Sequence, residues 1–343
     1  MDCNQYIWKS LEDEDSIYQH INERYSLMND NSDIINQDLG IIDDKTESIT
    51  IEIDFQKETN KSDKKKKKVT KSLSNYTIEL KQSLTSLKSN VNGNSTTGFV
   101  VWQSTRFFLN WLLNHNGLSF LDWNNKQYSF IELGTGVNCS NSIILSNYSK
   151  DYFISTDQKG ILNKLEENSR NNLNEIQIYN KTCKYLSETQ IKDGNVQTKE
   201  KFFISKSLKK NEFLLDLSYQ NLFHYEIEHL DWCDNITYDS FIICHGTMIK
   251  AIDSKLVVLA VDVIYNEFLI MPFLKTLKKL LSFKPSSEAL VVLQLRDESI
   301  ILDFLFEALE LGIYVQTIDD AGSELIIGCS RHAIYKLSLI HPL

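Results

Sequence analysis

The stretch from Tyr128 to Leu145 constrains the fold of this chain more than any other. Its apolar run, Phe130 to Leu133, breaks at Gly134 and Gly136 and then resumes at helical spacing, a pattern that predicts a strand, a tight turn and a helix. Glycines at such a turn let a ligand approach the backbone closely, and the first amides of the helix point toward it with the positive end of the helix dipole. The sequence therefore predicts a nucleotide-type binding turn.

Two details distinguish this turn from a dinucleotide site: Cys139 at the position of the third glycine, and the carboxylate of Glu132 at the strand end. A Gly-x-Gly-x-x-Gly fingerprint needs a third glycine where this chain has Cys139, which weakens the case for a bound pyrophosphate. Glu132 lies at the strand end, where its carboxylate can accept hydrogen bonds from a cationic or amine-bearing ligand. Asp157 follows the apolar strand 152–156, about 20 residues past the glycines, at the separation from which an acidic side chain reaches ribose hydroxyls. S-adenosylmethionine, which carries an ammonium and a sulfonium but no phosphate, fits this pattern; an ordinary strand-helix turn is the plain alternative.

Composition indicates a folded protein without a membrane span. Of the 343 residues, 42% are hydrophobic and 11% aromatic, as in globular proteins. A net charge of −10 argues against a globally basic nucleic-acid binder. The six cysteines show neither Cys-x-x-Cys pairs nor Cys/His zinc spacing, so we expect free thiols in a reducing compartment and no metal site. With no signal pattern and no apolar run near 20 residues, we expect a soluble cytoplasmic protein.

Residues 1–95 are expected to form an extension before the main domain. Residues 1–46 predict either a partly helical segment packed on that domain or a loosely ordered one. Alternating patterns predict strands at 48–55 and 76–82 that can pair as a hairpin. The lysine block 61–71 between them repels itself and is expected to form a solvated, disordered hairpin tip, with a contact to ribosomal RNA or a nuclear-import signal as the alternatives.

The strongest buried-strand pattern in residues 96–343 is the β-branched run from Lys255 to Tyr265, typical of a parallel strand covered on both faces. It delivers Asp262 and Tyr265 to its carboxyl end, the edge at which open α/β sheets bind ligands. We favour this run as the central strand over the earlier apolar run 241–244, which we expect to lead into an insertion.

The remaining pattern predicts a Rossmann-like α/β fold with a mostly parallel sheet that ends in an antiparallel hairpin. The hairpin is expected from strands 313–318 and 324–329, joined by the polar turn 319–322. Insertions are expected near 184–211 and 245–255. The other predicted elements are a third strand at 175–179, a fifth at 289–295, and helices over 103–113, 159–172, 268–281 and 299–311.

Several short motifs follow one another along the chain: Val-Val-Trp102, Glu132-Leu-Gly-Thr-Gly136, Asp157, Leu230-Asp-Trp232 and Val261-Asp-Val-Ile-Tyr265. In this order they resemble the seven-stranded, S-adenosylmethionine-dependent protein lysine methyltransferases of the methyltransferase-16 group. A longer match, over 96–104 and 262–273, looks most like the fungal enzymes that methylate ribosomal lysines. The resemblance covers roughly residues 96–335.

This resemblance implies a class I methyltransferase fold, S-adenosyl-L-methionine as the cofactor, and a ribosomal protein, the first of the large subunit, as the substrate. It also implies a monomer. It places Trp102 beside the methionine end of the cofactor, the turn Gly134, Thr135 and Gly136 behind it, Asp157 on its ribose and Trp232 against its adenine, with Asp231 as a lesser candidate.

By the same resemblance Val261 would touch the cofactor, while Asp262 and Tyr265 would border the channel for the substrate lysine. A lysine with an unperturbed pKa of about 10.4 is a poor nucleophile, and desolvation in an aromatic channel lowers that pKa and releases the amine. In-line attack on the sulfonium methyl then needs positioning more than acid-base help. Asp262 and Tyr265 would orient the amine.

Two other functions stay open at this point. The same fold and cofactor can serve another acceptor, such as a translation factor, a chaperone, an N-terminal amine or a small molecule. A catalytically idle relative would bind partners through its surface, although it would have no physical need for Glu132, Asp157 and Trp232 together. Nucleic-acid methylation is disfavoured because no Asn-Pro-Pro-Tyr type motif follows Asp262.

Overall fold

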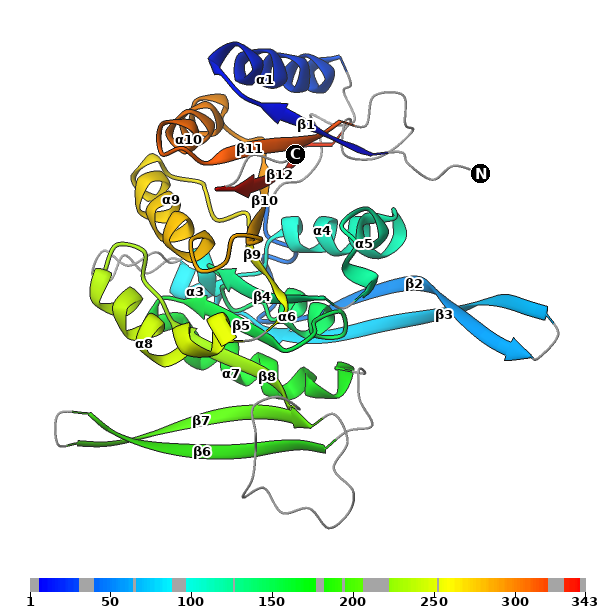
Figure 1. Cartoon of the computed structure of the whole chain (residues 1–343), viewed down its shortest axis with the longest axis vertical. Helices are drawn as coiled ribbons and strands as arrows, with labels where there is room; N and C mark the ends of the chain where they lie inside the picture. Colours follow the sequence, from blue (N-terminus) through cyan, green and yellow to red (C-terminus); the bar gives the residue numbers. More distant parts are fainter. Residues whose placement is uncertain are drawn as a thin grey trace.

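A sheet of ten strands runs through the computed structural model of this chain (Figure 1). The structure describes residues 6–30, 40–63, 66–87, 97–125, 127–176, 182–192, 195–205, 222–251, 253–319 and 330–339. In spatial order the strands are β1 (Ile7–Leu11), β11 (Tyr314–Asp319), β12 (His332–Ser338), β10 (Glu288–Gln294), β9 (Lys255–Val261), β4 (Tyr128–Leu133), β5 (Tyr152–Asp157), β8 (Leu222–His229), β7 (Asn195–Ser205) and β6 (Thr182–Lys192).

The strands from β11 to β8 confirm the predicted Rossmann-like sheet. β10, β9, β4, β5 and β8 are all parallel, whereas β12 runs antiparallel to both β10 and β11. From β4 the chain moves outward to β5 and β8 on one side, and later to β9 and β10 on the other. The strand order therefore reverses between β4 and β9, and such a switch point is where open α/β sheets leave a crevice for a ligand.

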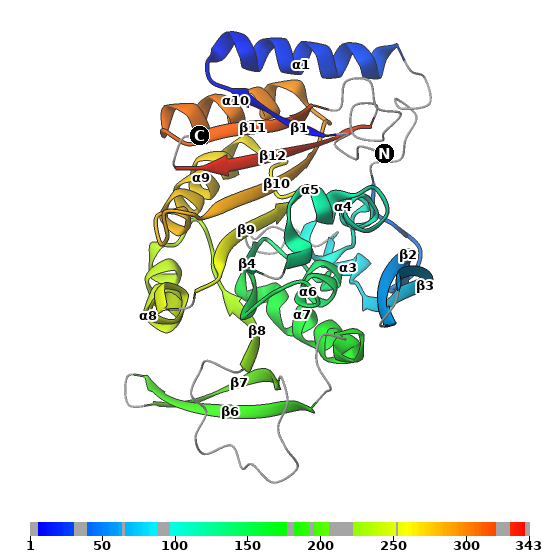
Figure 2. The same cartoon turned by 45° about the vertical axis from the view of Figure 1, so that its right-hand side comes forward.

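Helices cover both faces of this sheet (Figure 2). Alternation along β4 sends Phe130 into one hydrophobic core and Ile131 into the other, as expected for a strand buried on both sides. The first core is closed by α4 (Gln103–Asn114), α6 (Ser140–Ser146) and α7 (Lys159–Asn172), and the second by α1 (Glu14–Asn29), α8 (Asn235–Ala251), α9 (Glu267–Leu281) and α10 (Glu298–Glu310). The short turns are α3 (Leu84–Leu87), α5 (Gly117–Phe120), η1 (Thr97–Phe99), η2 (Trp123–Asn125) and η3 (Leu173–Glu175).

Two predicted elements of the second half differ in the structure. The apolar run 241–244 is part of α8, and residues 245–251 complete that helix. Phe241, His245 and Ile249 are its buried residues at a spacing of four, which is a helical period. In the terminal hairpin the strand that pairs with β11 is β12, and the predicted second strand, 324–329, lies outside the described residues.

The region after α7 differs as well. The third strand was expected at 175–179. Glu175 is instead the last residue of the turn η3, and residues 177–179 lie outside the described residues. The strand that pairs with β5 on this side is β8. Within the expected insertion 184–211, the described residues belong to the antiparallel pair β6 and β7, which lengthens the sheet past β8.

The N-terminal residues pack on the sheet, the first of the two expectations for them. β1 pairs with β11, and α1 begins with a capping box between Asp13 and Ser16. Arg24 on α1 donates hydrogen bonds from Nη2 to the carbonyls of Ser330 (2.9 Å) and His332 (2.7 Å).

The predicted N-terminal hairpin is confirmed as β2 (Ser48–Asp63) and β3 (Lys66–Lys81). The lysine block was expected to be disordered, but its described backbone is paired up to Asp63 and Lys66, because the two strands continue past their apolar halves. Among the described residues, no helix combines the length and the apolar character needed to cross a bilayer.

Candidate active site

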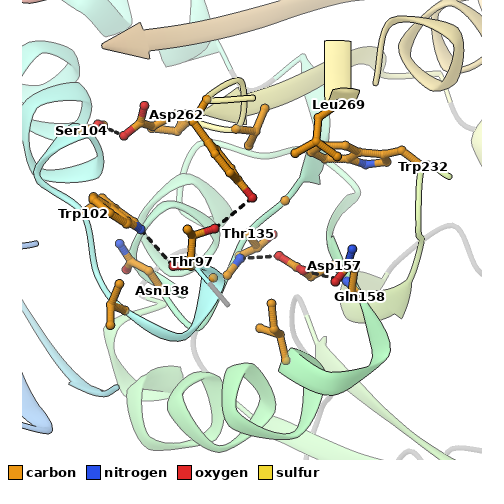
Figure 3. Close-up of a pocket in the computed structure, with 18 of the residues that line it drawn as sticks. Thr97, Trp102, Ser104, Thr135, Asn138, Asp157, Gln158, Trp232, Asp262 and Leu269 are labelled. Atoms are coloured by element: carbon orange, nitrogen blue, oxygen red, sulfur yellow. Dashed lines mark hydrogen bonds between the residues drawn. The ribbon is translucent and has the colours of Figure 1, made fainter. Parts of the chain in front are cut away.

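A cavity opens at the carboxyl ends of β4, β5 and β9, at the switch point of the sheet (Figure 3). The predicted site residues that line it are Trp102, Gly134, Thr135, Gly136, Asp157, Trp232, Val261, Asp262 and Tyr265. Glu132 is the predicted residue that the structure does not bring to the cavity wall.

The turn after β4 needs its glycines. Gly134 and Gly136 have φ angles of 67° and 66°, in the left-handed region that other residues rarely adopt. A Cβ atom on Gly134 would lie 2.8 Å from Cγ1 of Val263 and 3.2 Å from the ring of Trp232. The backbone of this turn therefore forms the floor of the cavity, and Trp232 lies directly over it.

Asp157, the last residue of β5, is bound to the same turn. Its Oδ2 accepts a hydrogen bond from the amide of Gly136 and its Oδ1 from the amide of Gln158, both at 2.7 Å. Burial raises the pKa of Asp157 to about 6, against the two amide bonds that lower it. Because each carboxylate oxygen has two lone pairs, the side chain can still accept hydrogen bonds from a ligand.

Glu132 points away from the cavity, toward α6. Its Oε1 accepts a hydrogen bond from Nδ2 of Asn141 on α6 at 2.7 Å, and its side chain is buried. Burial raises the pKa of Glu132 to about 8, although the bonds to Asn141 and Thr135 lower it. In this position Glu132 holds α6 against β4, and a contact from Glu132 to a cofactor stays a prediction.

Hydrogen bonds across the cavity tie the segment before α4 to the loop after β9. The indole Nε1 of Trp102 donates to the carbonyl of Thr97 at 3.0 Å, and the Thr97 hydroxyl donates to that of Tyr265 at 2.9 Å. The carbonyl of Gly98 accepts from the amide of Val137, directly after the glycine turn, at 2.8 Å. Trp102 and Tyr265 are thus held on one rim of the cavity.

Asp262 lies at the end of β9 with a φ angle of 58°, which is rare for a residue with a side chain. Its Oδ2 accepts hydrogen bonds from Oγ of Ser104 at 2.7 Å and from Nη2 of Arg296 at 2.9 Å. Burial raises the pKa of Asp262, and the charge of Arg296 opposes that rise. Asp262 is therefore not a bare carboxylate facing the cavity.

Arg296 is a functional candidate that the sequence analysis missed. Its guanidinium stacks on the ring of Trp102, 4.9 Å from the ring centre, and its Nε donates to Oε1 of Gln294 at 2.7 Å. Gln294 in turn donates from Nε2 to the hydroxyl of Ser104 at 2.6 Å. Arg296 follows the predicted strand 289–295, so the strand-end rule applied to Asp262 would also have selected it.

The chain is similar to curated proteins over almost its whole length. No family model matches it. Proteins named "Ribosomal lysine N-methyltransferase 5" from Vanderwaltozyma polyspora, Candida glabrata and Saccharomyces cerevisiae (strain AWRI796) are 34%, 32% and 31% identical to it, over 95%, 95% and 96% of this chain and 98% of each relative. A solved O-methyltransferase from neocarzinostatin biosynthesis, in complex with S-adenosylmethionine, matches 69% of this chain and 56% of its own at 10% identity, with a TM-score of 0.35.

Proposed function

The chain belongs to the ribosomal lysine N-methyltransferase 5 family, and we propose that it transfers a methyl group from S-adenosyl-L-methionine to a lysine side chain of a ribosomal protein. The similarity to these relatives along nearly the full chain carries the proposal. The cavity at the switch point of the sheet supports it, because its glycine turn, its buried carboxylate and its aromatic wall fit this cofactor.

The residues present fit S-adenosylmethionine at specific points. The glycine at position 134 lets Val263 and Trp232 pack directly against the backbone of the turn, so the Trp232 ring is held over the cavity floor. Asp157 would accept hydrogen bonds from the ribose hydroxyls. Trp232 would stack on adenine, and its ring also packs edge-on against Phe273, with 5.2 Å between the ring centroids. The cofactor supplies an electrophilic methyl group on its sulfonium.

The opposite rim of the cavity suits the acceptor lysine. Trp102, beside the proposed methionine end of the cofactor, and Tyr265 offer aromatic surface, which desolvates the incoming side chain and lowers the pKa of its amine. Because Arg296 offsets the charge of Asp262, the site does not favour the protonated amine as an isolated carboxylate would. These side chains would orient a neutral amine in line with the methyl group.

We further propose that the substrate is the first protein of the large ribosomal subunit and that the enzyme is a monomer acting in the cytoplasm, with a nuclear pool as a second location. A net charge of −10 supports a basic protein as the partner, since opposite charges favour encounter. The lysine block 61–71 is the one segment for which we keep a contact to nucleic acid as a proposal.

The proposed activity can be tested by incubating the purified chain with methyl-labelled S-adenosylmethionine and ribosomal proteins from a strain that lacks the enzyme. We expect label on one lysine of a large-subunit protein, located by mass spectrometry. The Asp157→Ala variant is the control, and we expect it to transfer almost no label. Binding of the cofactor without label on any ribosomal protein would retain the fold and reject the substrate.

Cofactor binding should depend on pH through Asp157. Since its pKa is raised to about 6, the carboxyl group is mostly protonated at pH 5 and cannot accept two ribose hydrogen bonds as a carboxylate does. We expect the dissociation constant to fall about tenfold between pH 5 and 7.5. An acidic group whose pKa is raised in the folded state stabilises that state at low pH, and this contribution is lost as the pH rises through about 6. Asp157 therefore does not cause unfolding at pH 5.

Isothermal titration at several pH values measures this dependence. The Asp157→Asn variant, which has no carboxyl group to titrate, should bind weakly and with little dependence on pH. A wild-type affinity that stays constant across this range would contradict the assignment of Asp157 to the ribose.

A further inference from the structure

One buried face of β8 carries ionisable side chains where a covered strand ordinarily carries apolar ones. Alternation along β8 sends Phe223 and Tyr225 into the core beneath α6 and α7, and places His224, Glu226 and Glu228 on the opposite face. These three side chains are buried, with exposed fractions of 1%, 4% and 7%. Charged residues are almost never buried to this extent unless they are paired or bind a metal.

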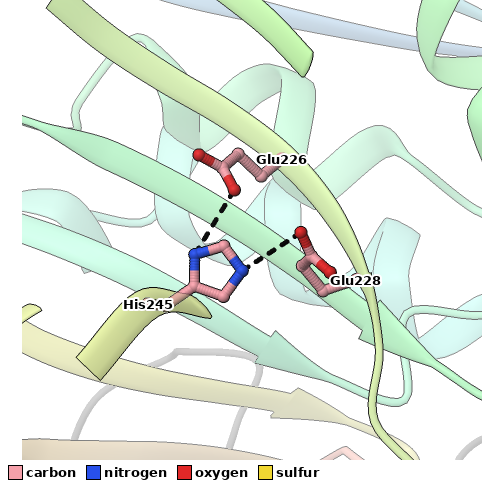
Figure 4. A group of neighbouring side chains, drawn as sticks. All are labelled: Glu226, Glu228 and His245. Atoms are coloured by element: carbon pink, nitrogen blue, oxygen red, sulfur yellow. Dashed lines mark ion pairs between the residues drawn. The ribbon is translucent and has the colours of Figure 1, made fainter. Parts of the chain in front are cut away.

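The helix that covers this face, α8, adds a histidine to this row of His224, Glu226 and Glu228 (Figure 4). Nδ1 of His245 lies 3.3 Å from Oε2 of Glu226, and its Nε2 lies 3.0 Å from Oε1 of Glu228. His245 is 1% exposed. Nδ1 of His224 lies 3.5 Å from the other oxygen of Glu226. Two carboxylates of the row therefore meet at one imidazole ring, away from water.

The charges of this cluster call for a further positive group. Two carboxylates lie side by side in the core here, which is costly without compensation, and His224 contacts only Glu226. Although Nε2 of His245 is 3.0 Å from Glu228, it forms no hydrogen bond of acceptable geometry.

A metal ion would bind the lone pair of Nε2 of His245, so this nitrogen would need no hydrogen-bond partner. One nitrogen of His245 and one oxygen from each of Glu226 and Glu228 lie within 4.8 Å of one another. Ligand atoms around a tetrahedral zinc ion are about 3.4 Å apart, so small side-chain movements would close the set. A divalent ion would also balance the charge of the two buried carboxylates.

We propose that Glu226, Glu228 and His245 bind a divalent transition-metal ion, and that zinc, which combines imidazole and carboxylate ligands readily, is its occupant. His224 contacts Glu226 and would orient that ligand from outside the coordination shell. The inference concerns metal binding alone and does not depend on the proposed methyl transfer.

The place of this site in the fold gives it a role. It joins the end of β8 to the middle of α8, and the connection between these two elements carries Asp231 and Trp232, which line the cavity. A metal ion there would hold the two ends of that connection and thereby fix the aromatic wall of the cofactor site. We assign this site a structural role because its three ligands are buried and none of them lines the cavity.

Elemental analysis of the full chain tests the proposal. After expression in zinc-supplemented medium and exhaustive dialysis, we expect about one metal ion per chain. Removal of the ion by a chelator should lower the melting temperature by several degrees, and added zinc should restore it. A different divalent ion at the same stoichiometry supports the site and replaces zinc as its occupant. Less than about a tenth of an ion per chain, with no shift of the melting temperature on addition of zinc, overturns the proposal.

Variants locate the ion. His245→Gln and Glu228→Gln should each lose it, whereas His20→Gln, which alters an equally buried histidine bonded to Tyr335 at 3.1 Å, should keep it. Cys244→Ser should also keep the ion, which separates the cluster from the exposed thiol beside it. If neither cluster variant folds, zinc titration of the chelator-treated wild type, followed by its melting temperature, gives the decision. Retention of the ion by a folded His245→Gln variant rejects this site.

Discussion

Replacement of Asp157 by alanine is expected to weaken the binding of S-adenosylmethionine at least about hundredfold while the chain stays folded. Two hydroxyl-to-carboxylate hydrogen bonds of about 1.5–3 kcal/mol each account for a loss of this size. The side chain also accepts the amides of Gly136 and Gln158, so its removal loosens the turn that forms the floor of the cavity. Both effects act on cofactor binding.

Isothermal titration gives the affinity of this variant and circular dichroism its fold. Asp151→Ala is the matched control, because Asp151 precedes β5 just as Asp157 ends it, on the opposite edge of the sheet from the cavity. We expect the control to bind as the wild type does. An unchanged affinity in the Asp157→Ala variant would remove this residue from the cofactor site.

The second large effect is expected for Arg296→Ala, which should lower kcat at least about tenfold and leave the affinity for S-adenosylmethionine within about threefold. Its loss leaves Trp102 without the stacked guanidinium and lets the pKa of Asp262 rise further. Arg296 is about a third exposed, so we expect the free energy of unfolding to fall by only about 1–2 kcal/mol. The predicted damage is to the acceptor side of the cavity.

A double-mutant cycle with Asp262→Asn separates this effect from general instability. If Arg296 acts through Asp262, the double variant should be little slower than the slower single variant, because the pair is lost as a unit. Arg106→Ala removes an exposed arginine of α4 and serves as the control. Losses in kcat that add across the two sites, or a large loss of cofactor affinity, would contradict this role for Arg296.

The central sheet and its binding edge could be predicted because their patterns are local. The glycine turn at Gly134 and Gly136 and the buried run that became β9 depend on a few neighbouring residues, and both ended at the cavity. The run 241–244, expected to lead into an insertion, lies in α8 instead, and four apolar residues alone fit a strand or a helix equally well. Only the wider spacing of Phe241 and Ile249 on α8 distinguishes the two.

Contacts between distant parts of the chain could not be predicted in this way. Arg296 and Trp102 are far apart in sequence and meet because β10 ends and α4 begins at the same edge of the cavity. The alternation of His224, Glu226 and Glu228 is also that of a half-exposed strand, with its polar face in water. Only the packing of α8 over that face, with His245 in its middle, gives the row its significance.

The pairing of β1 with β11 also determines which strand forms one edge of the sheet. Without β1, the edge of the sheet would be β11, whose six residues would offer unpaired amides and carbonyls to another chain. With β1 in place the edge strand has only five residues, and α1 packs behind it. Residues 6–29 thus cover β11 at this edge, so we expect a fragment that begins at residue 96 to expose β11 to intermolecular strand addition.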